Sequence, residues 1–190
     1  MWTTLLQADA TVRVWLTAWH RPWLDALMAA VSGIGRGGLV WLAVGVLLTL
    51  RRRLRLAALW QLVLALVLAF VVSDGILKPL VNRPRPFAAH PMTVRIVGSI
   101  PGGGSFPSGH AAAAFAAAFV LAQYWPGSGL IFWPLAALIA GSRIYVGAHY
   151  PLDVLVGALL GCAIGWLVVG RSAPVLRGRM PADEGGSPAG

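Results

Sequence analysis

Long apolar runs, separated by short polar or basic segments, make up most of this chain. The runs cover residues 39–50, 56–77, 108–125, 130–142 and 151–170. A helix needs about 20 predominantly apolar residues to cross a bilayer, and these runs approach or reach that length. The pattern predicts an all-α integral membrane protein with a bundle of five to six transmembrane helices.

Residues 2–20 show a different pattern, in which apolar and polar positions alternate at helical spacing. Trp15 and Trp19 belong to the apolar side, and Asp9 and Arg13 to the polar side. Such a pattern is typical of an amphipathic helix that lies in the membrane interface.

A second short helix is predicted at residues 23–34, because Pro22 favours a helix start and a glycine-rich stretch follows. Asp25 and the short length disfavour an independent crossing. We therefore expect residues 1–36 to be interfacial or partly embedded, and residues 37–170 to form the transmembrane core. Residues 171–190 are rich in Pro, Gly and Ser, have little to bury, and are predicted to be a disordered cytoplasmic tail.

Basic residues between the runs predict the orientation of the chain. Arg51, Arg52, Arg53 and Arg55 follow one run, and further arginines follow residues 151–170. Positively charged loops stay on the cytoplasmic side, which places the polar stretch 78–107 on the periplasmic or outer face of the cell membrane. The helix of residues 56–77 should end at Lys78, because a residue before proline disfavours helical geometry.

The composition is also typical of a membrane protein, and the charge indicates which kind of partner it binds. The chain is 58% hydrophobic and 11% charged, with a net charge of +9, whereas globular domains carry about a quarter charged residues. The positive charge favours an anionic partner, but its distribution between apolar runs disfavours nucleic acid. Membrane lipids with phosphate head groups fit better. The single Cys162 excludes an intramolecular disulfide.

The last apolar run carries Gly157, Gly161 and Gly165, spaced four residues apart. One helix face is therefore bare, and a neighbouring helix can approach closely. We expect this face to pack within the chain rather than at a dimer seam, and no particular oligomeric state is predicted.

Candidate chemistry begins at Ser108, which stands between a Gly- and Pro-rich segment and an alanine-rich run. Ser108 is predicted to be a helix N-cap, although such a serine is often only structural. A helix N-terminus gathers free N–H groups that suit an oxyanion such as phosphate. His110, in the first turn, could exchange a proton with a bound group.

Two further stretches supply cations and a possible base. Lys78 and Arg85 are suited to phosphate, although they could also snorkel beside anionic lipid. His149 and Asp153 are four residues apart and share a face if the helix extends back to His149. The carboxylate would then fix the imidazole tautomer, although both residues could instead be ordinary helix-end groups. Arg143 adds a cation, and the shortage of acids and cysteines predicts no metal and no cofactor.

Together these segments resemble the three-part signature of the type 2 phosphatidic acid phosphatase superfamily, over about residues 56–170. The matching motifs are Lys78-x6-Arg85-Pro86, Pro107-Ser108-Gly109-His110 and Ser142-Arg143-x5-His149-x3-Asp153.

The resemblance implies a helical bundle and a metal-independent phosphatase. It assigns His149 as the nucleophile that becomes a phosphohistidine, and Asp153 as the residue that orients it. His110 would protonate the leaving group and then activate water. The implied phosphate-binding residues are Lys78, Arg85, Ser108, Gly109 and Arg143.

An active site at the outer rim of a helical bundle can take a head group while the lipid tail stays in the membrane. We expect a lipid phosphate substrate, with undecaprenyl diphosphate favoured over phosphatidylglycerophosphate and phosphatidic acid. Two other classes remain: a vanadate-dependent oxidase, disfavoured because the known type is soluble, and a non-catalytic lipid-binding relative, disfavoured because every motif position is present.

Overall fold

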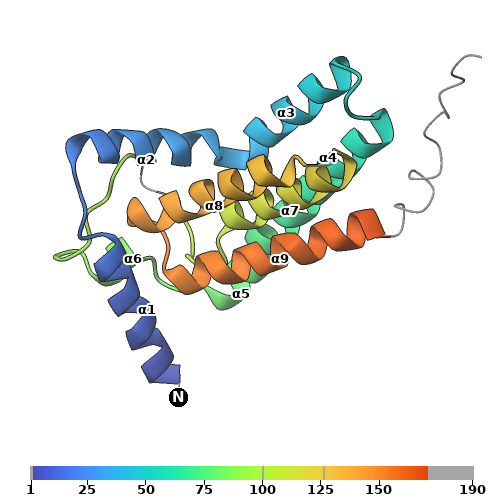
Figure 1. The fold of residues 1–190 in the computed structure, drawn as a ribbon. Helices are drawn as coiled ribbons and strands as arrows, with labels where there is room; N and C mark the ends of the chain where they lie inside the picture. Colours follow the sequence, from blue (N-terminus) through green and yellow to red (C-terminus); the bar gives the residue numbers. More distant parts are fainter. Residues whose placement is uncertain (1, 100, 126, 171–190) are drawn as a thin grey trace, which may run out of the picture.

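The computed structural model describes residues 2–99, 101–125 and 127–170, and every regular element among them is helical (Figure 1). In chain order the elements are α1 (Trp2–Leu16), α2 (Pro22–Ile34), η1 (Arg36–Gly38), α3 (Leu39–Leu50), α4 (Leu56–Phe70), η2 (Val71–Leu77), α5 (Lys78–Val81), α6 (Pro86–Ala89), α7 (Gly109–Tyr124), α8 (Gly129–Tyr145) and α9 (Pro151–Gly170). The predicted all-α architecture is confirmed, and the predicted tail, residues 171–190, lies outside the described residues.

Fewer helices are long and apolar enough to cross a membrane than the sequence predicts. Among the described residues, Leu56–Ala89 and Pro151–Gly170 are each long and apolar enough to span a bilayer. The pair α2 and η1–α3, bent by 49°, would make a third as one broken span. Helices α7 and α8 are apolar but have only 16 and 17 residues. The predicted five to six spans are therefore not confirmed.

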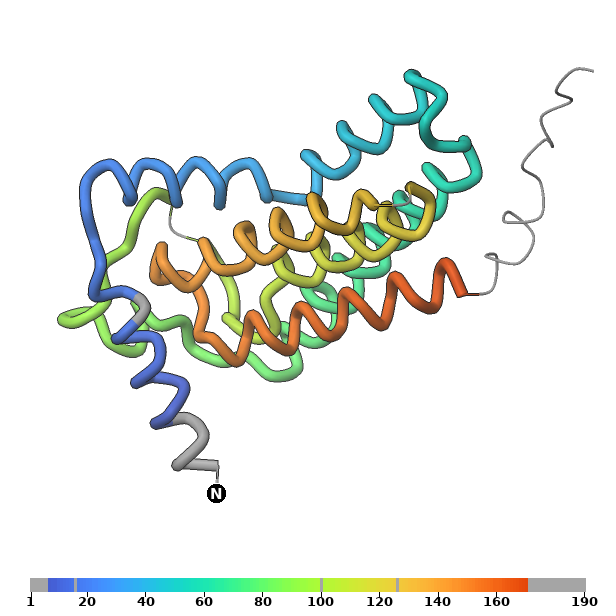
Figure 2. Tube along the Cα trace, in the orientation of Figure 1, coloured from blue at the N-terminus to red at the C-terminus, as the bar shows by residue number. Residues whose placement is uncertain are grey.

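Helix α7 lies at the centre of the bundle, packed against α4, α8 and α9 (Figure 2). Its buried positions are mostly alanine, and these small side chains let the surrounding helices approach closely. A Cβ on Gly157 would lie 2.5 Å from the Ser108 carbonyl oxygen, and one on Gly165 would lie 2.7 Å from Phe119 Cβ. The bare face of α9 thus packs on α7, which confirms the prediction of packing within the chain.

The predicted end of a helix at Lys78 is wrong. The chain stays helical through η2, a π-helical segment, and through α5 as far as Val81. The Lys78 N–H bonds to the Ser73 carbonyl, so the helix is wide at this point. Pro79, in the first turn of α5, has no N–H to leave unpaired. The helix ends instead at Asn82, whose φ is 42°.

Helix α1 forms as predicted but ends at Leu16, before residue 20, and extends away from the bundle (Figure 1). Its polar side faces the protein: Asp9 and Arg13 are 7% and 3% exposed, whereas Val12 and Trp15 are 46% and 68% exposed. The polar residues are buried because Asp9 bonds to Arg83 and to the start of α9. The interfacial position of α1 stays a prediction.

Candidate active site

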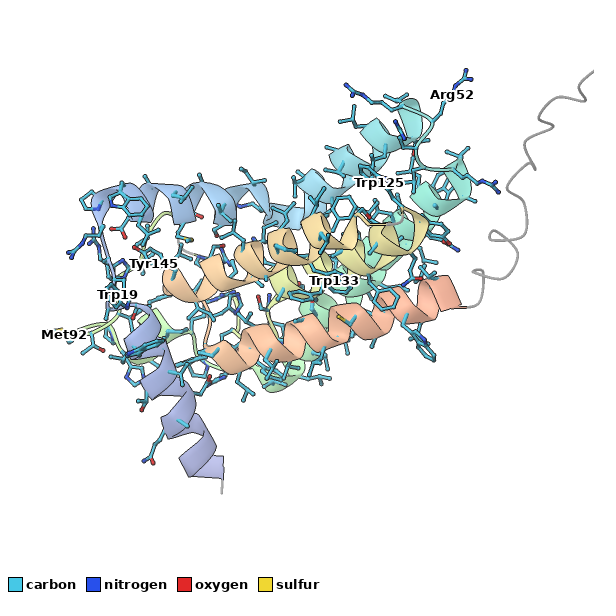
Figure 3. The ribbon with its side chains drawn as sticks, in the orientation of Figure 1. Trp19, Arg52, Met92, Trp125, Trp133 and Tyr145 are labelled. Atoms are coloured by element: carbon cyan, nitrogen blue, oxygen red, sulfur yellow. The ribbon has the colours of Figure 1, made fainter. Side chains whose placement is uncertain are left out.

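The motif residues come together at the end of the bundle where α8 stops at Tyr145 and α9 begins. In Figure 3, Tyr145 and Met92 mark this end, and Arg52 marks the opposite one. The loop after Tyr145 carries His149, and the loop before α7 carries Ser105 and Ser108.

His149 lies in a turn whose backbone is fixed from α8. The N–H groups of Ala148 and His149 both donate to the Arg143 carbonyl at 3.1 Å. Helix α9 begins at Pro151, so it does not extend back to His149, and the two motif residues do not share a helical face. The turn nevertheless brings His149 Nδ1 to 3.7 Å from Asp153 Oδ2.

The nearest partner of His149 Nδ1 is the Ser105 carbonyl oxygen, at 2.7 Å. A carbonyl can only accept, so Nδ1 carries the proton and Nε2 is left unprotonated, with a lone pair. Burial is the main cause that lowers the pKa of His149 to about 4; the positive charges of Arg143 and Arg85 act in the same direction, and Asp153 opposes the shift. His149 is therefore neutral at physiological pH.

Arg85 lies beside this lone pair and is 5% exposed. Its Nη1 is 3.3 Å from His149 Nε2 and donates to the Ala148 carbonyl at 3.0 Å. The other two nitrogens bond to the glycine run: Nη2 donates to the Gly102 carbonyl at 2.8 Å, and Nε donates to the Gly103 carbonyl at 2.9 Å. The guanidinium is thereby fixed next to the nitrogen that can act as nucleophile.

Asp153 is fully buried, and its two carboxylate oxygens have different partners. Oδ1 accepts from Arg83 Nη1 at 2.6 Å, and Oδ2 accepts from the Tyr150 N–H at 2.9 Å. Arg83 was not among the predicted site residues. The available signal was its position two residues before Arg85, in the same proline-rich stretch.

Ser108 is the N-cap of α7, as predicted, and its hydroxyl accepts from the Ala111 N–H at 3.4 Å. The Ser108 N–H donates to the Asp153 backbone carbonyl at 2.9 Å, which ties the start of α7 to the first turn of α9. Gly109 leaves no room for a side chain, because a Cβ there would collide with the Asp74 carboxylate.

His110 lies in the first turn of α7, and Lys78 and Asp74 lie beside that N-terminus. Lys78 forms an ion pair with Asp74, which also accepts from the Ser73 hydroxyl at 2.7 Å. Asp74 was not among the predicted site residues, although a lone acid within an apolar run is itself a sign of function. His110 Nε2 is buried and lacks a hydrogen-bond partner in the part of the chain that the structure describes.

Arg143 completes the predicted set from α8. The side chain is 7% exposed, and Nη1 donates to the Ser32 hydroxyl of α2. Its Nε is buried and has no partner among the described residues.

A cavity of about 380 Å³ adjoins His110. Apolar side chains of α3 and α4 line most of it, including Leu42 and Leu66, and Asp74 and Gly109 also line it. Nowhere in residues 2–99, 101–125 and 127–170 do three or more His, Cys, Asp or Glu side chains cluster so that they could hold a metal ion.

Fold and site together define a helical membrane protein with a cationic, histidine-containing site at one end. The chain belongs to the PAP2 superfamily, because residues 58–173 match this family. The expected family is thus confirmed.

Named relatives agree with this assignment. The chain is 30% identical to a lipid A 4'-phosphatase of Bacteroides thetaiotaomicron, covering 86% of this chain and 76% of the relative. It is 36% identical to an undecaprenyl-diphosphatase of Sulfolobus acidocaldarius, covering 77% of this chain and 69% of the relative.

Solved structures have the same fold. LpxE of Aquifex aeolicus superposes with a TM-score of 0.74 at 31% identity, over 85% of this chain and 94% of LpxE. A transmembrane phosphatidylglycerolphosphate phosphatase of Bacillus subtilis gives 0.75 at 23% identity, over 93% and 90% of the two chains, and shows the fold alone. The predicted class, a membrane phosphatase, is confirmed.

Proposed function

We propose that this chain removes phosphate from a lipid phosphate or diphosphate through a phosphohistidine on His149, without a metal ion. The observation that carries the proposal is the 2.7 Å contact between His149 Nδ1 and the Ser105 carbonyl oxygen. It leaves Nε2 unprotonated, with its lone pair toward Arg85 Nη1 at 3.3 Å. A neutral imidazole with one nitrogen fixed by an acceptor is an activated nucleophile.

In the first step, His149 Nε2 attacks phosphorus, and an N–P bond forms as the P–O bond to the leaving group breaks. His110, which takes up a proton when the anionic phosphate binds beside it, gives that proton to the leaving oxygen. In the second step, His110 takes a proton from water, the resulting hydroxide attacks phosphorus, and the N–P bond breaks to release inorganic phosphate. His110 Nε2 has no hydrogen-bond partner among the described residues, which supports this role, because a buried nitrogen without a partner gains from an incoming oxygen.

Charge on the phosphoryl oxygens would be offset by cations and backbone donors. Arg85 and Arg143 flank the turn that carries His149, and the Ser108-capped end of α7 adds N–H groups. Lys78 would add a further positive charge, which is partly offset by its ion pair with Asp74. Such fixed donors stabilise the spread negative charge of a phosphoryl-transfer transition state.

The substrate we favour is undecaprenyl diphosphate, with phosphatidylglycerophosphate and phosphatidic acid as alternatives. An undecaprenyl-diphosphatase and a decaprenylphosphoryl-5-phosphoribose phosphatase, named for polyprenyl substrates, are 36% and 35% identical to this chain. The apolar cavity beside His110 could hold the first part of a lipid tail, and the remainder would stay in the bilayer.

We also propose that the site faces the periplasm or cell exterior across the inner membrane. Arg52 and its basic neighbours lie at the end of the bundle opposite Tyr145, where His149 is found (Figure 3). Positively charged loops favour the cytoplasm, so the site would lie on the other side.

The decisive experiment measures inorganic phosphate released from the three lipids in detergent micelles, with and without EDTA. We expect release that survives EDTA, is blocked by vanadate, and is lost in His149→Ala. His90→Ala is the matched control, because His90 is exposed and lies outside the three motifs. Release from none of the lipids, or equal release by the His149→Ala variant, would overturn the proposal and favour a non-catalytic relative. Halide oxidation with vanadate would favour an oxidase.

A further inference from the structure

Asp9 of the N-terminal helix reaches the active-site end of the bundle. Its Oδ1 accepts from the Leu152 N–H at 2.8 Å, and its Oδ2 accepts from Arg83 Nη2 at 2.7 Å. The Leu152 N–H belongs to the first turn of α9, where backbone donors have no partner within the helix. Asp9 therefore caps α9 from a different helix and holds an arginine at the same time.

The other arm of Arg83 binds Asp153. Nη1 donates to Asp153 Oδ1 at 2.6 Å, and the guanidinium carbon lies 3.9 Å from the centre of the Tyr150 ring. Arg83 thus joins two carboxylates and stacks on an aromatic ring, which its rigid planar fork allows and the single ammonium of a lysine does not.

Asp153 connects Arg83 to two parts of the active site. Its second oxygen is 3.7 Å from His149 Nδ1, and its backbone carbonyl accepts from the Ser108 N–H at 2.9 Å. A shift of Asp153 would therefore move the turn that carries His149 and the N-terminus of α7 together.

Electrostatics makes the three groups depend on one another. Asp9 and Asp153 are 7% and 0% exposed, and the one positive charge of Arg83 lies between them. Removal of the Arg83 charge would leave two buried carboxylates without compensation, which is strongly unfavourable. Removal of the Asp9 charge would leave the Arg83–Asp153 pair but would take away one of the two carboxylates that hold the guanidinium in place. The match to the PAP2 superfamily covers residues 58–173, so Arg83 lies inside the matched region and Asp9 lies outside it.

We propose that Arg83 and Asp9 are positioning residues that hold Asp153, and through it His149 and the α7 N-terminus, in the geometry for phosphoryl transfer. Helix α1 is then a part of the active site rather than only a membrane anchor. This inference rests on the proposed function of the site.

The test compares steady-state kinetics of Asp9→Asn, Arg83→Gln, Arg83→Lys and the double variant D9N/R83Q on the wild-type enzyme's best lipid substrate. Asp9→Asn keeps an oxygen for the Leu152 N–H and removes only the charge. We expect kcat to fall by about 10- to 100-fold with little change in KM, as for other groups that orient a catalytic side chain. Arg83→Lys should recover only part of the loss, because it cannot reach both carboxylates. The double variant should be no worse than R83Q, because both changes break the same contact.

Asp25→Asn is the matched control, because Asp25 is also 7% exposed and pairs with Arg95 and Tyr145. It should keep wild-type kcat even if it lowers the unfolding temperature in detergent. Wild-type kcat in D9N and R83Q, additive losses in the double variant, or an equal loss in D25N would overturn the positioning role. A wild-type protein that releases no phosphate would instead overturn the proposed function, so the two failures are distinguishable.

Discussion

His149 Nδ1 lies 2.7 Å from the Ser105 carbonyl oxygen, whereas the nearest oxygen of Asp153 is 3.7 Å away. A backbone carbonyl from the loop before α7 therefore fixes the imidazole tautomer. The Asp153 carboxylate, which the motif resemblance assigns to this task, is shared with Arg83 and the Tyr150 N–H. Removal of the Asp153 charge should therefore leave the tautomer of His149 unchanged, and the two effects on activity can be measured separately.

Asp153→Asn is expected to lower kcat by about 100-fold, well short of the roughly 10⁴-fold loss seen where a carboxylate alone sets a histidine tautomer. The reason is that Ser105 would still hold the Nδ1 proton. Phosphate release by purified D153N measures the loss, and His149→Ala sets the zero level. A 10⁴-fold loss in folded D153N would show that the Ser105 contact does not suffice.

Stability should fall in acid because of His149. Burial lowers its pKa to about 4 in the folded protein, compared with about 6.5 in an unfolded chain. The unfolded state therefore binds more protons between these values, so stability is complete above pH 6.5 and decreases as the pH falls toward 4.

The check is the unfolding temperature of wild type and His149→Gln in detergent at pH 7 and at pH 4.5. Glutamine does not titrate in this range, so wild type should lose more stability than H149Q over the same interval. Equal losses in the two proteins would contradict a buried, neutral His149.

Much of this architecture can be predicted from the sequence, because membrane-spanning helices depend on local composition. The run at residues 151–170 became helix α9 with the same limits, and the cap at Ser108 formed as expected. The three motifs likewise indicated His149, Arg85 and the start of α7 as neighbours.

Other features depended on contacts between distant residues. Asp9 is 74 positions from Arg83, and nothing in the pattern of α1 shows that its polar side would be turned inward to meet that arginine. The ion pair of Lys78 with Asp74 needed the helix to continue into α5, which the rule for residues before proline disfavours. The wide π-helical segment before Pro79 made this possible.

Gly109→Ala is expected to reduce activity and stability together. The new Cβ would collide with the Asp74 carboxylate, beside the α7 N-terminus, and overpacking of this kind costs about 1–3 kcal/mol. Gly141→Ala in α8 is the matched control, since a Cβ there meets nothing within 4 Å. It should leave activity unchanged and, through better helix propensity, leave stability equal or higher. Similar losses in both variants, measured as kcat and unfolding temperature, would contradict the specific role of the Gly109 contact.

Sidedness can be tested at the two ends of the bundle marked by Met92 and Arg52 (Figure 3). Met92 is 94% exposed in the loop region that leads to the site, and Arg52 is exposed in the turn between α3 and α4. In a Cys162→Ser background, a membrane-impermeant maleimide should label Met92→Cys in intact cells and label Arg52→Cys only after permeabilisation. The physical reason is that positive charge holds the Arg52 turn in the cytoplasm, and the remaining arginines of that turn keep this bias in the variant. Labelling of Arg52→Cys but not Met92→Cys in intact cells would reverse the orientation and place phosphate release inside the cell.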